Sequence, residues 1–322
     1  MSEMRSFTFS EALDTIFVVQ KPAAEGKGED SFYCTADGDS AMISVCDGCG
    51  GLGARQYEAF KGHTGAYVAS RAVSGALHDW FRDHGKKEWN DSGKLTDSVD
   101  GYIRRAFRLC ESFNNETLKI FGSMVRPFPT TLACAYAVPD QEEILIHILW
   151  AGDSRIYLLD QDGLAQVTRD DTDIEDAFEN LTSDGAMTNV LSSDGDYVIH
   201  SRTLHIEKPV ILIAATDGCF GYVPSPVEFE RLLLEALLAS PDPPLFKSAL
   251  RKFMGEIAGD DLALSFMSFF FGDYKNMQAS FADRMHFLKA QYPEVLRDAA
   301  EDREILKRAW KNYRHSYERF LR

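Results

Sequence analysis

The chain has 322 residues, of which 45% are hydrophobic and 26% are charged, a composition typical of a globular protein that buries its own core. The formal net charge of −16 comes from 50 acidic against 34 basic residues. Such a field repels polyanions, which argues against nucleic acid as a general partner, whereas clustered acids are suited to divalent cations.

The cysteines and the apolar runs of the sequence bear on the cellular location of the protein. The 6 cysteines lie mostly in apolar stretches, which favours free buried thiols and a reducing, cytoplasmic location. Cys46 and Cys49 form a CxxC pair, but the sequence has no second CxxC and no His pair that could complete a zinc site. Structural zinc and redox chemistry therefore stay minor alternatives. No apolar run reaches the ~18 residues of a spanning helix, and no secretory signal is visible, so we expect no membrane partner.

The first third of the chain predicts strands followed by helices. Strands are expected over 14–20, 32–35 and 41–46, and the last of these is apolar throughout. Apolar residues spaced three and four apart then predict a helix over 54–81 and another over 97–120.

The middle of the chain predicts an antiparallel meander, because short strands alternate with turn signals. The expected strands are 130–138, 144–150, 156–159, 164–168, 198–205 and 210–215. Residues 169–196 are polar and acidic and read as a surface flap. Two helices, 226–239 and 244–258, precede a last strand over 262–271. This order suits two antiparallel sheets stacked face to face with helices outside.

The end of the chain differs from the rest, and we divide the sequence into a main domain, 1–274, and an extension, 275–322. Apolar residues in the extension predict two amphipathic helices. Its last part, 307–322, is basic, with Glu318 as its single acid. A helix packed on its own domain is the favoured interpretation, and a contact with a partner or a second copy is the alternative.

Acidic residues recur where predicted strands begin or end. Two apolar strands end in an Asp-Gly pair, Asp47-Gly48 and Asp217-Gly218. Further acids at strand ends are Glu29, Asp30, Asp153, Asp260 and Asp261. Any one Asp-Gly pair is ordinary turn chemistry, but if these ends meet, their mutual repulsion calls for divalent cations, and oxygen ligands suit Mg²⁺ or Mn²⁺.

A competing motif lies at residues 48–53, where GCGGLG matches the GxGxxG fingerprint of dinucleotide-binding proteins. That fingerprint requires a second parallel strand with an acidic end about 20 residues later. The predicted helix continues there instead, and the meander is unlike a doubly wound sheet. Dinucleotide binding therefore stays a minor alternative.

Taken together, the motifs resemble the metal-dependent protein phosphatase family (PPM, or type 2C) over about residues 10–272. The segments that carry the resemblance are Glu29-Asp30-Ser31, VCDGCGGLG, PTTLACAYA, AGDSRIYLLDQDGLAQVTRDD, AATDGCFGYV and GDDLALSF. The resemblance implies an α+β, four-layer αββα sandwich of two antiparallel sheets, with the helical extension added. It also implies hydrolysis of phosphoserine and phosphothreonine in proteins.

The resemblance further implies a metal centre of two Mg²⁺ or Mn²⁺ ions, with a third, weaker site. Asp47 would bridge both ions. The other implied ligands, some acting through water, are Gly48, Asp217, Asp260, Glu29, Asp30 and, for the third ion, Asp153. The ions would activate water for attack on the phosphorus.

The sequence departs from the family where the substrate phosphate would be held. Glu25 stands where the family usually has an Arg, so Lys27 or Arg126 is predicted to bind the phosphate. Cys49 stands where many members have a His that serves as general acid. The metal ligands are intact, so an active phosphatase is predicted, and an inactive regulatory or binding protein of the same fold is the alternative.

Overall fold

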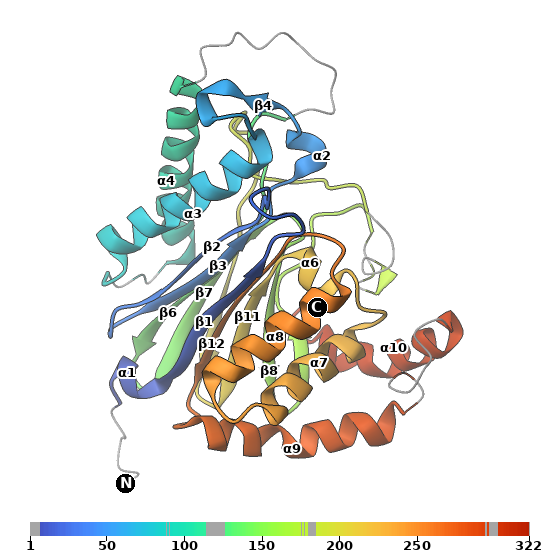
Figure 1. The fold of residues 1–322 in the computed structure, drawn as a ribbon. Helices are drawn as coiled ribbons and strands as arrows, with labels where there is room; N and C mark the ends of the chain where they lie inside the picture. Colours follow the sequence, from blue (N-terminus) through green and yellow to red (C-terminus); the bar gives the residue numbers. More distant parts are fainter. Residues whose placement is uncertain are drawn as a thin grey trace.

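The computed structural model describes residues 7–87, 89, 91–113, 126–174, 176, 178–179, 185–293, 295 and 302–321. Two five-stranded antiparallel sheets stack face to face, and helices cover both outer faces (Figure 1). This arrangement confirms the predicted four-layer α+β sandwich with helices at its C-terminal end.

The first sheet has the order β1-β12-β11-β8-β9. Its strands are β1 (Leu13–Lys21), β12 (Leu262–Phe269), β11 (Val210–Ala215), β8 (Arg155–Asp160) and β9 (Gly163–Gln166). Along β11, Ile211 and Ile213 face the outer helices, whereas Leu212 and Ala214 face the other sheet. Because both faces are buried, these strands read as continuous apolar runs.

The second sheet has the order β10-β7-β6-β3-β2. Its strands are β10 (His200–Ile206), β7 (Glu143–Ala151), β6 (Leu132–Asp140), β3 (Ala41–Cys46) and β2 (Ser31–Ala36). Ile43 and Ile146 point toward the first sheet and are fully buried. The core between the sheets holds the strand ends in fixed relative positions.

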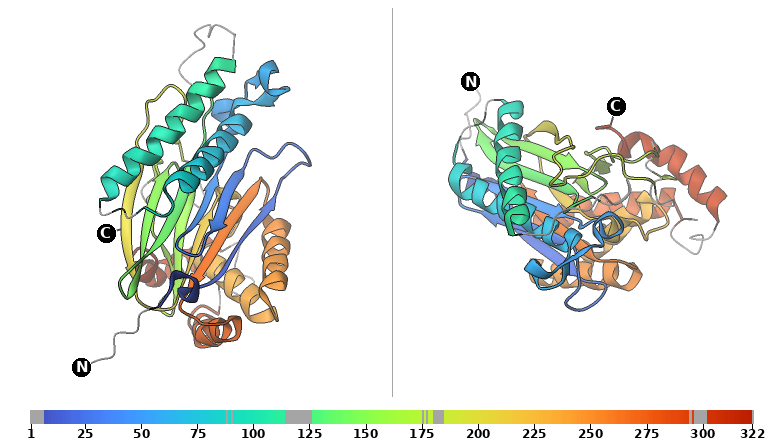
Figure 2. Two further views of the ribbon diagram at one scale, coloured as in Figure 1. Left: turned by 90° about the vertical axis from the view of Figure 1, so that its left-hand side faces the viewer. Right: turned by 90° about the horizontal axis from the view of Figure 1, so that it is seen from above.

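Helices form the two outer layers, as the side view in Figure 2 shows. The second sheet is covered by α3 (Gly65–His84) and α4 (Ser92–Phe113). The first is covered by α7 (Pro226–Ala239), α8 (Pro243–Ile257), α9 (Tyr274–Gln291) and α10 (Arg303–Tyr317). The remaining elements of the described residues are short: α1 (Phe9–Ala12), α2 (Gly50–Gly53), β4 (Gln56–Tyr57), a 3₁₀ turn (Glu58–Phe60), β5 (His63–Thr64) and α6 (Asp217–Phe220).

The predicted helix over 54–81 is wrong in its first part, because residues 56–64 form the small β4–β5 hairpin. Lys61 and Gly62 have φ values of 58° and 79°, which a right-handed helix cannot contain. Thr64 then caps α3 by accepting a hydrogen bond from the Tyr67 amide.

Other differences are small or concern chain segments that are not described. The second predicted helix begins at Ser92 instead of residue 97, and its predicted end at residues 114–120 lies outside the described residues. The last strand ends at Phe269, because Phe270 has a φ of 67°. The sheets are antiparallel, so the dinucleotide-binding alternative, which needs a parallel sheet, is wrong.

The C-terminal helices pack on the main body of the chain. The apolar faces of α9 and α10 belong to the same buried cluster as β8, β11 and α7. The buried carboxylate of Glu230 on α7 receives two hydrogen bonds from Arg284 of α9 and one from the Tyr313 hydroxyl of α10. Within the described parts of the chain, no helix combines the length and the apolar character that crossing a membrane requires.

Candidate functional site

The acidic strand ends meet at one end of the sandwich. The two short helices that follow β3 and β11, α2 and α6, lie at the same end in Figure 1. Ser31 pairs with Cys46 across β2 and β3, so Asp30 and Asp47 lie opposite each other at that end. Antiparallel pairing of β11 with β12 likewise brings the start of β12 next to Asp217.

The backbone of Asp47 is fixed by two neighbouring threonines. Its amide donates to Oγ1 of Thr131 at 2.9 Å, and its carbonyl accepts from the Thr130 hydroxyl at 2.6 Å and from the Thr131 amide at 2.9 Å. Both threonines are fully buried. The carboxyl group is thereby directed by a rigid backbone rather than by a flexible loop.

Asp30 is buried and is held by Thr216, the residue that precedes Asp217. The Thr216 hydroxyl donates to Oδ2 of Asp30 at 2.8 Å, and Oγ1 of Thr216 accepts the Ala263 amide at 2.9 Å. One buried hydroxyl therefore joins the ends of β11 and β12 to the residue that precedes β2.

Burial and mutual repulsion raise the pKa values of four aspartates. For Asp30 and Asp47 the main cause of the raised pKa is burial, and nearby carboxylates add to it, with Asp217 acting on both. The pKa of Asp153 is raised to about 8 by burial and by the charges of Asp217 and Asp170. Burial also raises the pKa of Asp217, although a hydrogen bond from Asp47 lowers it. These four carboxyl groups, which we call the acidic cluster, therefore lie close enough to repel one another.

Asp260 lies at the rim of this cluster. It is exposed, its Oδ1 accepts the Asp261 amide at 2.7 Å, and its charge raises the pKa of Asp217. Asp261 is buried and has a different position, because its carboxylate accepts the backbone amides of Ala23 and Glu29. It thus closes the loop that carries Glu29.

Glu29 is directed toward the same end of the sandwich. Its Oε1 accepts a hydrogen bond from the Thr64 hydroxyl, and burial raises the pKa of its carboxyl group. Its carbonyl accepts from Ser70, and Arg71 donates to the carbonyls of Gly28 and Glu29. Helix α3 therefore supports this loop from the side opposite Asp261.

The two Asp-Gly pairs need glycine for space. A Cβ at Gly48 would lie 2.8 Å from the carbonyl oxygens of Glu29 and Ala66. A Cβ at Gly218 would lie 1.8 Å from the Asp261 carbonyl oxygen. Glycine at both positions lets the chain pass close to the backbone that precedes the neighbouring strand, β2 for Gly48 and β12 for Gly218.

Cys49 faces the acidic cluster and stays a neutral thiol. Burial raises the pKa of its thiol well above the usual range, and the charges of Asp47, Asp153 and Asp217 raise it further. A thiolate nucleophile is therefore not available there at neutral pH.

The two predicted phosphate-binding cations differ in position. Lys27 is exposed on the loop that leads to Glu29, and no hydrogen bond or ion pair joins its side chain to another described residue. Arg126 donates from Nη1 to the Asp196 carbonyl at 3.1 Å and lies 4.0 Å from Asp194. Of the two, Lys27 has the side chain that is available to a ligand.

The donor set fits divalent cations. Oδ1 of Asp153 is buried and has no hydrogen-bond partner among the described residues, and the neighbouring carboxyl groups hydrogen-bond each other. Among the same residues, no three His, Cys, Asp or Glu side chains already converge as ligands of one ion. Carboxyl groups that share protons turn toward each other, as the hydrogen bond between Asp47 and Asp217 shows, whereas a cation would turn their oxygens toward itself.

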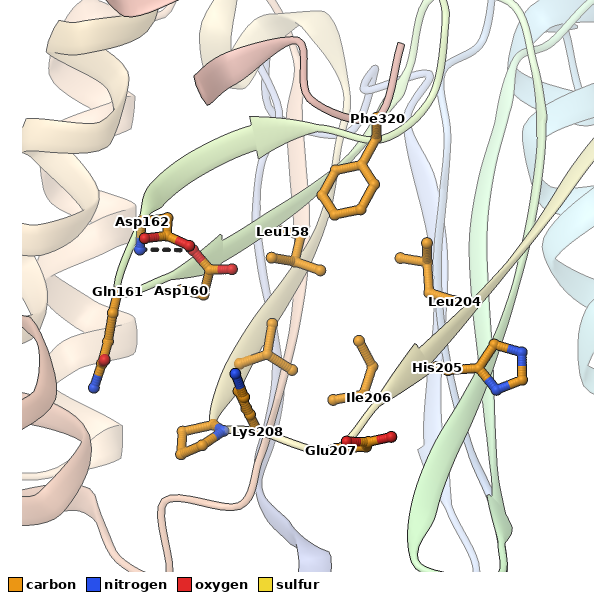
Figure 3. A pocket seen from close by; sticks show the side chains of 12 residues that line it. Leu158, Asp160, Gln161, Asp162, Leu204, His205, Ile206, Glu207, Lys208 and Phe320 are labelled. Atoms are coloured by element: carbon orange, nitrogen blue, oxygen red, sulfur yellow. Dashed lines mark hydrogen bonds between the residues drawn. The ribbon is translucent and has the colours of Figure 1, made fainter. Parts of the chain in front are cut away.

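A cavity elsewhere in the molecule has no part in this chemistry. It has a volume of about 650 Å³ and is lined by residues of β8, of β10 and of the loop between β10 and β11 (Figure 3). Leu158, Leu204 and Ile206 form its apolar floor, and Phe320 lies over it. None of the predicted site residues lines it.

Several of the supporting residues were not predicted from the sequence. Thr131, Thr216 and Asp261 stand inside the recognised motifs, and Thr216 and Asp261 each lie directly beside a predicted ligand in the sequence, which was a usable signal. Thr64 and Arg71 lie in the region predicted as one continuous helix, so nothing in the sequence marked their contact with Glu29.

Comparison with known proteins decides the family. The sequence matches the family described as Protein phosphatase 2C over residues 25–255, which is most of the chain. The chain belongs to the protein phosphatase 2C family. No curated protein matches its sequence significantly.

Solved structures agree with this protein phosphatase 2C assignment at the level of the fold. The serine/threonine phosphatase PstP/Ppp of Mycobacterium tuberculosis is 18% identical with a TM-score of 0.55, over 80% of this chain and 98% of that one. Stp1 of Staphylococcus aureus is 16% identical with a TM-score of 0.57, over 83% and 99%. A further PstP structure, described as a complex with 2 manganese ions, is 18% identical with a TM-score of 0.53, over 80% and 98%.

Proposed function

We propose that this protein phosphatase 2C family member hydrolyses phosphoserine and phosphothreonine in proteins with the help of Mg²⁺ or Mn²⁺. One observation carries the proposal: Asp30, Asp47, Asp153 and Asp217 share one end of the sandwich, and burial and mutual repulsion raise their pKa values. Carboxyl groups gathered at such a cost are typical of a functional site. The manganese ions described for PstP support the choice of metal.

The residues of this chain have separate parts in the proposed reaction. The carboxylates of Asp47 and Asp217 would hold the cations, together with the Gly48 carbonyl. The remaining proposed ligands are Glu29, Asp30, Asp260 and, for a third ion, Asp153. When bound, the cations supply positive charge that neutralises the phosphate and activates water for attack on phosphorus.

Other residues would bind the substrate phosphate or lie next to it. Lys27 would approach the phosphate as a single point charge, since its exposed ammonium group has no hydrogen bond or ion pair with any other residue that the structure describes. Arg126 is the second candidate, although its guanidinium group contacts Asp196. The Cys49 thiol is neutral at neutral pH and adds no further negative charge next to the phosphate.

Phosphate release is the direct test. The protein is stripped with EDTA, and hydrolysis of phosphoserine, phosphothreonine and phosphotyrosine peptides is measured with and without Mn²⁺. We expect metal-dependent release from the first two peptides and at least a hundredfold loss in Asp47→Asn. Asp162→Asn is the matched control, because Asp162 is an exposed acid in the turn between β8 and β9.

Thermal unfolding with Mn²⁺ separates the proposal from its alternative. Stabilisation by Mn²⁺ in the wild type, lost in Asp47→Asn, together with hydrolysis supports the phosphatase. Stabilisation without hydrolysis of any peptide indicates the inactive binding protein. Neither stabilisation nor hydrolysis would overturn the metal centre itself.

A further inference from the structure

Helix α10 contacts a segment that lies beside the candidate site. We call residues 169–174, with Asp176 and Phe178, the flap segment, since they belong to the region predicted as a surface flap. The ring of Phe178 stacks on Trp310 of α10, with centroids 6.0 Å apart and planes 21° apart. Both rings are buried, at 3% and 6% exposure. Residues far apart in the sequence thus form one apolar contact.

An ion pair reinforces this apolar contact. Arg314 of α10 lies 2.9 Å from Oδ2 of Asp176, while Oδ1 of Asp176 accepts the amide of Phe178 at 2.9 Å. The same arginine donates to Glu318 at 2.7 Å, which fixes its orientation. Asp176 therefore joins α10 to the turn that presents Phe178 to Trp310.

The flap segment is in turn bonded to the loop that carries Asp153. Asp171 accepts the Gly152 amide at 3.0 Å through its carboxylate, and the Asp171 amide donates to the Gly152 carbonyl at 3.0 Å. Asp170 forms a buried pair with Arg155, two residues after Asp153, with a shortest distance of 2.6 Å. These bonds place the flap segment directly beside the loop that carries Asp153.

A second set of contacts joins α10 to Arg155, the residue that pairs with Asp170 of the flap segment. The Tyr317 hydroxyl lies 3.4 Å from that of Tyr157, and Nη1 of Arg155 donates to Tyr157 at 3.0 Å. Beyond the helix, Arg319 donates to Asp160 at 2.9 Å, and the Phe320 carbonyl accepts from Arg202 of β10. Figure 3 shows the ring of Phe320 near Leu158 and Leu204 in the pocket that these residues line.

We propose that α10 is a positioning element that fixes the flap segment beside the candidate site and thereby sets how well the site accepts a protein substrate. This proposal rests on the proposed phosphatase function. A pocket of about 520 Å³ is lined both by the flap segment, with Arg169 and Asp171, and by the C-terminal part of the chain, with Arg314. The position of the flap segment decides the shape of this pocket, which a chain flanking the phosphoresidue would meet and a small aryl phosphate would not.

The test uses the full chain and removes the ion pair without touching the acidic cluster. Arg314→Ala and Asp176→Asn each break the pair, and Lys311→Ala removes the same charge from an exposed position of the same helix. Hydrogen exchange is followed in peptides covering 169–179, and kinetics are measured with a phosphothreonine peptide and with p-nitrophenyl phosphate. For a partly exposed pair we expect exchange there to be roughly two- to fivefold faster in both variants and unchanged in Lys311→Ala.

The kinetic readouts separate positioning from a general structural role. We expect KM for the phosphopeptide to rise roughly two- to fivefold in Arg314→Ala, kcat/KM for the aryl phosphate to stay within about twofold, and Arg314→Lys to restore most of the loss. The double variant should be no worse than either single variant. Unchanged exchange in 169–179, or equal losses for both substrates, would overturn the proposal. If the wild type hydrolyses nothing, the proposed function fails, and the exchange experiment still decides whether α10 holds the flap segment.

Discussion

The acidic cluster should make the metal-free protein less stable, and replacing Asp153 by Asn should reveal this. The pKa of Asp153 is raised to about 8, and an unfolded aspartate has a pKa of about 3.9. Between these two values the native carboxyl group keeps a proton that the unfolded chain has released. Stability of the metal-free protein must therefore fall as the pH rises from 4 to 8.

The size of the effect follows from the same two values. At pH 7 the native group is protonated and the unfolded group is ionised, which corresponds to a loss of about 4 kcal/mol. An Asn side chain has no charge to suppress, but its amide needs hydrogen bonds that this acidic surrounding supplies in part. We therefore expect Asp153→Asn to recover about 1 to 3 kcal/mol at pH 7 in EDTA.

Thermal unfolding in EDTA at pH 5, 6, 7 and 8 measures this gain. In a chain of this size each kcal/mol changes Tm by about 2 °C, so the variant should melt about 2 to 6 °C above the wild type at pH 7. The gap should be smallest at pH 5 and largest at pH 8, and Asp162→Asn should show no such trend. A variant that melts at or below the wild type, with a gap that does not depend on pH, would refute the reasoning.

Three further outcomes are expected. Asp261→Ala leaves two backbone amides of the loop 23–29 without their acceptor, so urea unfolding should show a loss of about 1 to 3 kcal/mol, with Asp261→Asn less affected. Arg284→Met leaves the fully buried carboxylate of Glu230 without its cation and should cost about 3 to 5 kcal/mol in the same assay, whereas a loss below 1 kcal/mol would contradict the pairing. Lys27→Ala should raise KM for a phosphopeptide several-fold with kcat little changed, and unchanged kinetics would remove its proposed role.

The fold could be predicted from the sequence because its strands carry their own signals. The runs 41–46 and 210–215 are apolar throughout and end in Asp-Gly, and both strands have these bounds in the structure. Helix ends were less predictable where backbone conformation decides them. The residues before α3 have helical spacing of apolar side chains, yet the positive φ values of Lys61 and Gly62 turn the chain into a hairpin.

The candidate site could be predicted in its acids but not in its supports. Each aspartate that precedes a glycine is visible along the chain, and antiparallel stacking brings Asp47 and Asp217 to one end. The contacts of Thr64 with Glu29 and of Trp310 with Phe178 join segments that lie 35 and 132 residues apart, respectively, and no local pattern encodes them. The favoured interpretation of the basic extension, a helix packed on its own domain, is confirmed, because the apolar faces of α9 and α10 are buried against this chain.

The raised pKa values have a cause that local rearrangement cannot remove. The backbone of Asp47 is fixed by Thr130 and Thr131, and glycine at position 48 holds it within contact of the Glu29 carbonyl. The strand ends that carry the carboxyl groups therefore cannot move apart, and protons or cations are left to relieve the repulsion. Protons are scarce above neutral pH, so an apparent affinity for Mn²⁺ that increases between pH 6 and 8 follows directly from this rigidity.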